Sequence, residues 1–439
     1  MEEFINSVTL DKDKCKGCTN CIKTCPTEAI RVRNGKAYII KERCIDCGEC
    51  IRVCPHHAKK AVADKLEMIG NYQKAIALPA PSFYGQFPSE YSRKKLLIAL
   101  KNIGFDGVFE VAAGAELVSA ETEKRLQTEN FKKPMISSAC PAVVRLIQMR
   151  FPGLIDNILK LESPMQISAV MARKLFSEKF GISENELGIF FISPCAAKVT
   201  AVKSPIGIKK SAVNGVIPIS EIYGLVHESL KNTEDDNQTN IFSSDIGVGW
   251  AGSGGESNAL SSGKTLAVDG IQNIIKVFEQ IENDKIENVV FIEALSCPEG
   301  CLGGPLAVEN RYVAKSRLKQ HMEEAKSEKA QIKPVLSKAI TWSEPIFPSS
   351  VLKLDDDVMI ALGKIEQIEK IEKDLPGLDC GACGAPNCKA LAEDIVRGIA
   401  KETDCVFKLR ERVRQLASEM IELESELPHT MNRTEKNEN

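Results

Sequence analysis

The sequence predicts an α/β domain with parallel sheets, flanked by a small α+β domain toward the N-terminus and by a small helical domain with a helical tail toward the C-terminus. Between about residues 70 and 350, short apolar runs alternate with amphipathic stretches, as expected for strands and helices that follow one another along a chain. Both flanking segments are instead dominated by closely spaced cysteines. The 439 residues suit two to four domains, and the 43% of hydrophobic residues suffice for several buried cores.

Charge and hydropathy argue against two classes of partner. The 57 basic and 60 acidic residues leave a net charge of −3, which does not support binding to nucleic acid or to an anionic membrane through bulk electrostatics. No apolar run reaches the length of a membrane span, and the acidic start, Met-Glu-Glu-Phe-Ile-Asn, differs from a signal peptide. We therefore expect a cytoplasmic protein with no nucleic acid and no membrane as partner.

Apolar runs in the central segment mark the expected strands. They are Lys74–Pro79, Gly107–Val111, Met135–Ser138, Gly188–Ser193 and Val289–Leu295. Three cysteines come just after such runs: Cys140, Cys195 and Cys297. Ligands of open α/β sheets gather beyond the carboxyl ends of the strands, so cysteines far apart in the sequence can converge on one site there. The pair Cys140-Pro141 also indicates a strand-to-helix turn, where a helix N-terminus would stabilise a thiolate.

The sixteen cysteines fall into four groups of four. Disulfides are not expected in a large chain without an export signal. Because a cubane-type iron–sulfur cluster takes four thiolates, the grouping predicts four 4Fe-4S clusters. The groups are Cys15, Cys18, Cys21 and Cys25; Cys44, Cys47, Cys50 and Cys54; Cys140, Cys195, Cys297 and Cys301; and Cys380, Cys383, Cys388 and Cys405.

The first two groups read CKGCTNCIKTCP and CIDCGECIRVCP, and both match the bacterial ferredoxin run C-x2-C-x2-C-x3-C-P. In such runs the fourth cysteine binds the other cluster, which pairs Cys54 with the first group and Cys25 with the second. Between the runs, Asn34-Gly35 predicts a hairpin turn. We interpret residues 1–60 as an α+β bacterial ferredoxin-like domain with two clusters, with zinc knuckles as the alternative.

The last group, CGACGAPNC followed by Cys405, resembles the small 4Fe-4S domain of corrinoid iron–sulfur proteins and of a membrane electron-transport complex subunit. The resemblance covers LPGLDCGACGAPNCKALAEDIVRGIAKETDC. It implies a one-cluster domain over residues 351–405. A zinc site is the alternative, since spacing alone does not choose the metal.

Three segments of the central domain, residues 70–350, resemble the signature motifs of iron-only (FeFe) hydrogenases: ISSACPAVV, FISPCAAK and EALSCPEGCLGG. In that family the four matching cysteines bind a 4Fe-4S cubane. One of them also bridges to a diiron unit with CO, cyanide and a dithiolate bridge, and the whole is called the H-cluster. The resemblance implies that Cys140, Cys195, Cys297 and Cys301 hold the cubane and that Cys301 is the bridge.

The same resemblance implies roles for residues around the diiron unit. Lys198 matches a lysine that hydrogen-bonds a cyanide, sensible because an ammonium stabilises an anionic ligand. On this basis Lys198, Cys301 and Ser163 are assigned to catalysis. The residues assigned to cofactor binding are Ala80, Pro81, Ser82, Ala139, Pro164, Pro194, Lys198 and, in the glycine-rich GVGWAGSGG, Trp250.

Several positions depart from the family pattern. Ala139 stands where a second cysteine normally passes protons to the diiron site, and alanine cannot carry a proton. Other departures are Ser193 and Leu295 for methionines, Met165 for a glutamine and Ala201 for a glutamate. Proton transfer must be slow or follow another route, for which Glu121, Glu123 or ordered water are candidates. These changes resemble the divergent, sensory-type branch of the family.

The C-terminal segment, 406–439, carries a heptad pattern in an otherwise charged helix, followed by a polar end expected to be disordered. The apolar positions are Val406, Leu409, Val413, Leu416, Met420, Leu423 and Leu427. The helix either forms a homodimer or contacts a signalling partner, or it packs on its own domain.

These observations together predict an anaerobic enzyme that converts two protons and two electrons reversibly into H2. Low turnover favours a use in H2 sensing or regulation, and the clusters call for a redox partner such as a ferredoxin. The alternative is an electron carrier, or an iron–sulfur assembly protein, that holds only 4Fe-4S clusters. Lys198 argues against that alternative, because without cyanide it has little reason to lie beside Cys195.

Overall fold

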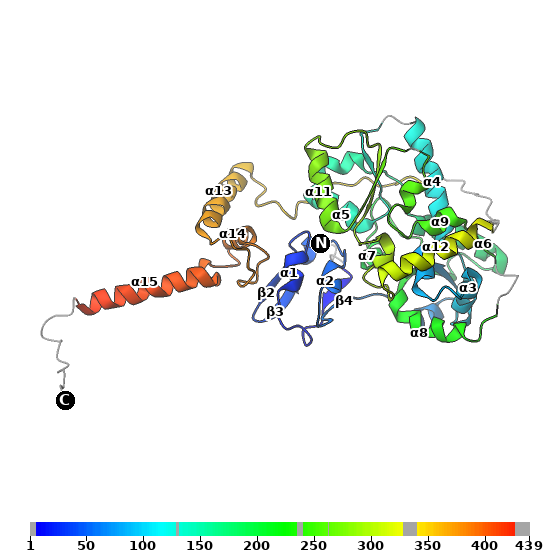
Figure 1. Cartoon of the computed structure of the whole chain (residues 1–439), viewed down its shortest axis with the longest axis horizontal. Coiled ribbons are helices and arrows are strands. Elements are labelled where there is room, and N and C mark those ends of the chain that lie inside the picture. Colours follow the sequence, from blue (N-terminus) through cyan, green and yellow to red (C-terminus); the bar gives the residue numbers. More distant parts are fainter. Residues whose placement is uncertain (1–5, 129–130, 235–239, 262, 328–339, 426–439) are drawn as a thin grey trace. The chain divides into compact units, whose positions relative to one another are not determined.

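The computed structural model describes residues 6–128, 131–234, 240–261, 263–327 and 340–425, which form two compact units (Figure 1). The first unit comprises the described parts of Met1–Cys15 and Ile39–Leu352, and the second those of Lys16–Tyr38 and Lys353–Asn439. The segment interpreted from sequence as one ferredoxin-like domain, 1–60, is therefore shared between the units.

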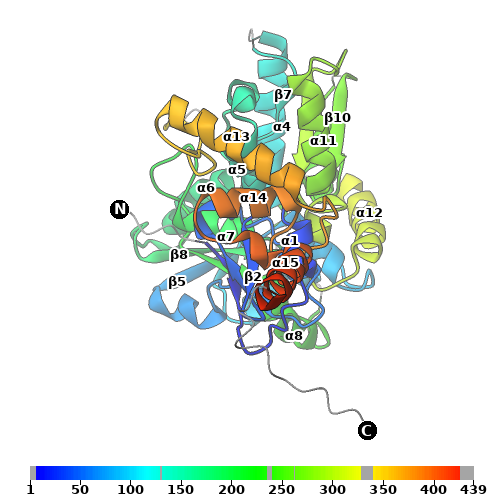
Figure 2. The same cartoon turned by 90° about the vertical axis from the view of Figure 1, so that its left-hand side faces the viewer.

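A four-stranded parallel sheet lies at the centre of the first unit. Its order is β6 (Gly107–Val108), β5 (Lys74–Pro79), β8 (Leu187–Ser193) and β9 (Gly215–Pro218), and β5 and β8 lie side by side in Figure 2. Strands with both faces covered read as continuous apolar runs, and every residue of β8 is buried.

Helices cover both faces of this sheet. On one face, α3 (Arg93–Asn102) and α8 (Ile219–Leu230) pack against alternate residues of β5 and β8. On the other, α4 (Val111–Thr128) and α6 (Pro164–Phe180) pack against the intervening residues. The alternation follows from the two-residue period of a strand.

A second parallel sheet has the order β10 (Thr265–Asp269), β11 (Phe291–Leu295) and β7 (Met135–Ile136). Its core on one side is formed with α5 (Pro141–Arg150) and α11 (Ile271–Glu282). The α/β class and the parallel sheets agree with the sequence prediction.

All the predicted strands are present, with shorter bounds at three. Gly107–Val111 was too long, because Val111 already begins α4. The strand predicted to end at Ser138 ends at Ile136, and the last begins at Phe291 instead of Val289. Strands β9 and β10 were not predicted, since β9 has only four residues and β10 is mostly half-buried.

The first unit also contains part of the N-terminal cysteine-rich segment. Strand β1 (Val8–Leu10) pairs antiparallel with β4 (Lys59–Ala61), and the short helix α2 (Glu49–Arg52) precedes β4. The other short helices of this unit are α7 (Ala196–Lys203), α9 (Asp245–Gly249) and α10 (Gly255–Asn258), and a longer one is α12 (Arg311–Ser327).

The second unit combines two distant parts of the sequence. The helix α1 (Asn20–Thr24) and the hairpin β2 (Ile30–Arg33) and β3 (Lys36–Ile39) come from the first part. As predicted, the hairpin turns at Asn34 and Gly35, with φ angles of 52° and 70°. The second part supplies α13 (Val358–Asp374), α14 (Cys388–Val396) and α15 (Val406–Ser425).

A buried ion pair joins these two parts of the second unit. The Arg31 guanidinium donates to both carboxylate oxygens of Asp394 at 2.7 and 3.0 Å, and both side chains are almost fully buried. The backbone N–H of Val32 also donates to Gly384 O at 2.8 Å, and a Cβ at position 384 would lie 1.9 Å from Val32 O. Glycine is thus required where the hairpin meets the cysteine loop.

No helix among the described residues is both long and apolar enough to cross a membrane.

Candidate metal centre

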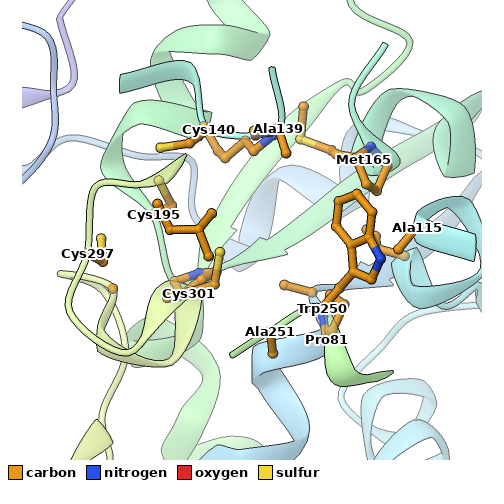
Figure 3. A pocket seen from close by; sticks show the side chains of 18 of the residues that line it. Pro81, Ala115, Ala139, Cys140, Met165, Cys195, Trp250, Ala251, Cys297 and Cys301 are labelled. Atoms are coloured by element: carbon orange, nitrogen blue, oxygen red, sulfur yellow. Dashed lines mark hydrogen bonds between the residues drawn. The ribbon is translucent and has the colours of Figure 1, made fainter. Parts of the chain in front are cut away.

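Four cysteines of the first unit converge at the carboxyl ends of the strands. Cys140 follows β7 and Cys195 follows β8, and each is the N-cap residue of the next helix, α5 or α7. Cys297 follows β11, and Cys301 lies in the 3-10 turn Gly300–Gly303. In Figure 3 the four side chains gather on one side of a cavity. The strand-end argument from sequence therefore describes how these residues come together.

The cavity is lined by most of the residues assigned to the cofactor from sequence. Those that line it are Ala80, Pro81, Ala139, Pro164, Pro194, Lys198, Trp250 and the four cysteines Cys140, Cys195, Cys297 and Cys301. Two assigned residues, Ser82 and Ser163, are not among the lining residues.

These two serines lie just outside the cavity for different reasons. Ser82 is in the 3-10 helix Pro81–Gln86, and its completely buried hydroxyl has no hydrogen-bond partner among the described residues. Ser163 is the N-cap residue of α6 and lines a neighbouring cavity, which shares Met165 and Lys198 with the first. The assignment of Ser82 to cofactor binding and of Ser163 to catalysis stays a prediction.

Burial strongly affects the thiols of Cys195, Cys297 and Cys301. It raises the pKa of Cys195 to about 12, with the neighbouring Cys297 and Cys140 adding to the effect. Burial likewise raises the pKa of Cys297 and of Cys301. Thiolates here are stable only beside positive charge, which bound iron supplies together with nearby cationic side chains.

Lys198 is one of those cationic side chains. Its Nζ donates to the carbonyl oxygen of Ala139 at 3.0 Å. Burial lowers its pKa, and the thiols of Cys195, Cys301 and Cys140 act against that effect. An ammonium has three N–H donors, so two remain beyond the bond to Ala139. Lys198 lines the cavity and can offer them to an anionic ligand there.

The side of the cavity away from the cysteines is apolar. Figure 3 shows Met165, Trp250, Ala115 and Pro81 there. The Trp250 indole N–H donates to Ser119 Oγ at 2.9 Å, which satisfies its polar atom away from the cavity and fixes the ring. Apart from the cysteines and Trp250, Lys198 and Ser296 are the lining residues that carry a polar side chain.

The serine at one departure from the family pattern has a local role. Ser193 Oγ accepts the backbone N–H of Cys195 at 3.0 Å. This bond satisfies an amide at the start of α7 and fixes the backbone that carries the Cys195 thiol. The candidate proton carriers Glu121 and Glu123 are engaged elsewhere, Glu121 with Arg125 at 3.4 Å and Glu123 with Ser261, and neither lines the cavity.

A buried pair of carboxyl groups behind the first motif was not found from sequence. Glu256 and Glu293 are at most 2% exposed. Ser137 donates to Glu256 at 2.7 Å and accepts the backbone N–H of Ala139 at 3.2 Å. Burial raises the pKa of Glu256 to about 8, and the nearby Glu293 adds to this. Glu256 therefore orders the loop of Ala139 through Ser137, while Glu293 accepts the backbone N–H groups of Gly254 and Ser257. No sequence spacing connects positions 137, 256 and 293.

The loop that carries the second cysteine group packs against the central domain within the same unit. Asp46 accepts a hydrogen bond from Thr200 Oγ1 at 2.8 Å and from the backbone N–H of Val8 at 2.9 Å. A Cβ at Gly48 would lie 2.4 Å from Cγ of Pro305, so the backbone approaches closely there. Within this loop Cys50 is buried, and Cys44, Cys47 and Cys54 are half-buried.

The remaining cysteines differ in their burial. In the first unit Cys15 is buried, and in the second Cys21 is buried, Cys25 half-buried and Cys18 exposed. The C-terminal group lies around α14: Cys405 is buried, Cys383 and Cys388 are half-buried and Cys380 is exposed. Burial raises the pKa of Cys383, with Cys380 and Cys405 contributing, so these three thiols are neighbours. The predicted exchange of Cys25 and Cys54 between clusters stays a prediction.

The central cysteines suit a cluster. Among the described residues, no group of three or more His, Cys, Asp or Glu side chains is gathered so as to hold a single metal ion. Four thiolates of a cubane bind four different irons and stand farther apart than the ligands of one ion. The four thiols, the Lys198 ammonium and the adjoining apolar cavity fit a cubane with a second, anion-bearing group beside it.

Comparison with known proteins agrees with this chemistry. Residues 73–305 match the family described as iron only hydrogenase large subunit, C-terminal domain. The chain belongs to this family. Residues 7–55 match a 4Fe-4S dicluster domain, and residues 375–407 match an Fe-S cluster domain.

The similar curated proteins of this hydrogenase family are distant. Iron hydrogenase 1 of Clostridium pasteurianum is 25% identical over 69% of this chain and 65% of its own length. The NADP-reducing hydrogenase subunit HndD of Solidesulfovibrio fructosivorans is 24% identical over 66% of this chain and 55% of its own length. The chain thus spans less than two thirds of either relative. The cytosolic Fe-S cluster assembly factor narfl of Danio rerio is 25% identical over 50% of this chain and 67% of its own length.

Among solved structures, a variant of the FeFe-hydrogenase HydA1 from Chlamydomonas reinhardtii is similar, with a TM-score of 0.46 and 18% identity. The similarity covers 58% of this chain and 85% of that one.

Proposed function

We propose that the protein is an iron-only hydrogenase of low turnover, which converts two protons and two electrons reversibly into H2 and is used for H2 sensing or regulation. The observation that carries the proposal is the position of Lys198. Its ammonium lies near the thiols of Cys140, Cys195 and Cys301. It donates one hydrogen bond to the carbonyl oxygen of Ala139, at 3.0 Å. A cation with spare donors at this point is suited to an anionic iron ligand such as cyanide.

The four central cysteines would hold a 4Fe-4S cubane, and Cys301 would also bridge to a diiron unit with CO, cyanide and a dithiolate. When bound, this group supplies redox-active iron with an open position for H2. The chain supplies thiolates, the Lys198 donor and an apolar wall around Trp250 that excludes water. The three other 4Fe-4S clusters would pass electrons from a redox partner such as a ferredoxin.

Low turnover follows from the wall of the cavity at position 139. A positioned general acid contributes roughly 100-fold to 10,000-fold to a proton-transfer step. Ala139 offers no proton, and its neighbours on this wall, such as Ala115, Met165 and Leu295, are apolar. A slow centre whose redox state follows H2 is better suited to reporting H2 than to consuming it.

A sensor also needs a way to pass on its state, and α15 is the proposed element. All its residues in Val406–Ser425 are exposed or half-buried, so the described part of the chain leaves its apolar ridge uncovered. The ridge consists of Val406, Leu409, Val413, Leu416, Met420 and Leu423; Leu427 of the predicted heptad pattern lies outside the described residues. We propose that this ridge packs against the same ridge of a second copy of the chain, because the charges beside it suit such a pair.

Infrared spectroscopy tests the proposed function. Anaerobically purified protein is given the synthetic diiron cofactor, and CO and cyanide bands that shift under H2 are expected. Lys198→Met should lose or displace the cyanide bands while keeping its 4Fe-4S content. Lys203→Met is the matched control on the same helix, because Lys203 pairs with Asp64 at 3.3 Å and does not line the cavity.

An electron carrier or iron–sulfur assembly protein with only 4Fe-4S clusters is the second candidate. It is favoured by the similarity to the assembly factor of Danio rerio. Absence of all CO and cyanide bands from wild-type protein with filled cubane sites would select this candidate and reject the hydrogenase.

A further inference from the structure

Arg52 connects the loop of the second cysteine group to the metal centre within the first unit. It is the last residue of α2, which also carries Cys50. Its Nη1 donates to Sγ of Cys297 at 3.4 Å and to the carbonyl oxygen of Gly303 at 3.1 Å. Its Nη2 donates to the Glu49 carboxylate, and the side chain is 16% exposed.

This contact is held in place by the packing of the whole loop. Gly48, just before α2, touches Pro305, which follows Cys301 by four residues. Asp46, two residues earlier, is bound to Thr200 of α7. Arg52 therefore reaches Cys297 from a helix whose preceding backbone is held at two points, unlike an arginine on a mobile surface loop.

Arg52 and Lys198 lie beside different thiols of the centre. Lys198 lies near Cys140, Cys195 and Cys301. Arg52 is the cation beside Cys297, and it counteracts the rise that burial causes in the pKa of this thiol. A positive charge beside Cys297 therefore comes from the loop of the second cysteine group, and nothing in the spacing of the cysteines predicts it.

We propose that Arg52 is a positioning residue that raises the reduction potential of the cluster held by Cys140, Cys195, Cys297 and Cys301. Reduction adds one electron to this cluster and removes one from its donor, and no bond is formed or broken. The guanidinium and its N–H···S bond stabilise the more negative, reduced state, because charge interactions are strong where water is excluded. Arg52 thereby favours electron transfer from the loop toward the centre.

The inference rests on the cubane half of the proposed function and does not require the diiron unit. The test uses full-length protein reconstituted with iron and sulfide alone. A potentiometric titration followed by electron paramagnetic resonance gives the midpoint of each cluster. The signal of the centre is identified as the component missing from a Cys140→Ala variant.

In Arg52→Met the ratio of reduced to oxidised centre at a fixed potential should fall about tenfold, which is about 59 mV for a one-electron couple. Arg52→Lys, which keeps the charge and loses the planar fork, should show a smaller fall. Glu49→Gln removes the negative partner and leaves Arg52, so the midpoint should rise.

Arg145→Met is the matched control, since Arg145 is a similarly enclosed arginine, 12% exposed, that faces Asp46 of the same loop at 3.7 Å. It should leave the midpoint of the centre unchanged. An unchanged midpoint in Arg52→Met with full iron content would overturn the inference. If Arg52→Met loses the cluster, the two other variants decide. A lower midpoint potential of the centre in Arg52→Lys together with a higher one in Glu49→Gln supports the inference. Unchanged midpoint potentials in both variants reject it. Failure of the hydrogenase proposal, seen as missing CO and cyanide bands, leaves this titration intact.

Discussion

The side chain at position 139 decides whether a proton donor borders the cavity. Ala139 is held by two contacts, its N–H to Ser137 and its carbonyl to Lys198, so its backbone is ordered although its side chain is inert. A cysteine at position 139 would be carried by a backbone that is already ordered. Alanine at this position therefore leaves the backbone ordered and offers no side chain that can donate a proton.

We expect Ala139→Cys to raise the rate of H2 evolution by a factor on the order of 10 to 100, because a thiol can donate a proton and a methyl group cannot. The rate is measured with a strong reductant and normalised to the infrared intensity of the loaded centre. Ala139→Ser, of similar size but a much weaker acid, is the control and should gain little. An unaltered rate in Ala139→Cys would show that proton supply does not limit turnover.

Glu256 makes stability depend on pH. Its native pKa is raised to about 8 from 4.5, so the native state keeps a proton that the unfolded chain releases above about pH 4.5. The resulting stability is present at low pH and is lost as pH rises toward 8. Glu256→Gln keeps the oxygen that accepts from Ser137 and removes the titration.

Relative to wild type, Glu256→Gln should be increasingly stabilised between pH 6 and pH 9, by an amount on the order of 3 kcal/mol at the upper end. Thermal unfolding midpoints of the anaerobic holoprotein at both pH values measure this. Glu123→Gln is the control, because hydrogen bonds from Ser261 lower rather than raise the pKa of Glu123. Equal differences from wild type at both pH values would contradict the assignment.

Among the elements, the ends of β7, β8 and β11 place three of the four central cysteines. These strands are short and apolar, and each continues into a turn that carries a cysteine. Their positions could be predicted because the two-residue period and the turn chemistry are local. Among all the predicted strands, the bounds were less accurate at β6 and β7. Each of these strands has only two residues before the chain turns.

Charges along α15 indicate how two copies would pair. Arg412 and Glu419 lie on one edge of the apolar ridge and form an ion pair at 3.8 Å within the helix. In an antiparallel pair Arg412 of each copy would face the partner subunit's Glu419 along this one edge. In a parallel pair Glu419 would face the partner subunit's Glu424, a repulsive contact. The pattern therefore favours an antiparallel dimer.

A charge exchange tests this orientation in the full-length protein. Arg412→Glu alone and Glu419→Arg alone should each weaken the dimer, because each places like charges opposite one another. The double exchange should restore it, and Leu416→Glu in the ridge should abolish it. Analytical ultracentrifugation gives the dissociation constants. Single and double variants with equal constants would exclude antiparallel pairing, and a monomeric wild-type chain would exclude the dimer.

At the scale of the whole molecule, cysteine groups approach one another within each unit. In the second unit, a Cβ at Gly381 would lie 3.4 Å from Lys23 Cε, so the loop of the C-terminal cysteines borders α1 with its Cys21. In the first unit, the loop of Cys50 meets Cys297 through Arg52. Because Cys380 is exposed, we propose that the C-terminal cysteine group holds the cluster at which electrons enter.

Cys380→Ala, which removes one ligand of that cluster, should slow reduction of the centre by an external ferredoxin about tenfold or more and leave the infrared bands of the centre in place. Stopped-flow infrared measurements follow the reduction. A small-molecule reductant that does not need the C-terminal cluster is the control and should act at the same rate on both proteins. Equal rates with ferredoxin would place the entry point elsewhere.

The sequence by itself determined the cysteine groups, the α/β class, the hairpin at Asn34-Gly35 and the motifs around Lys198, because spacing, periodicity and turn chemistry are properties of neighbouring residues. Tertiary structure alone decided that Arg52 reaches Cys297, that Glu256 and Glu293 share a buried site, and that Ser82 and Ser163 lie outside the cavity. It also decided that 16–38 folds with 353–425, through the Arg31–Asp394 pair. Such contacts join segments separated by tens to hundreds of residues, and only the packing of the folded chain determines which of them meet.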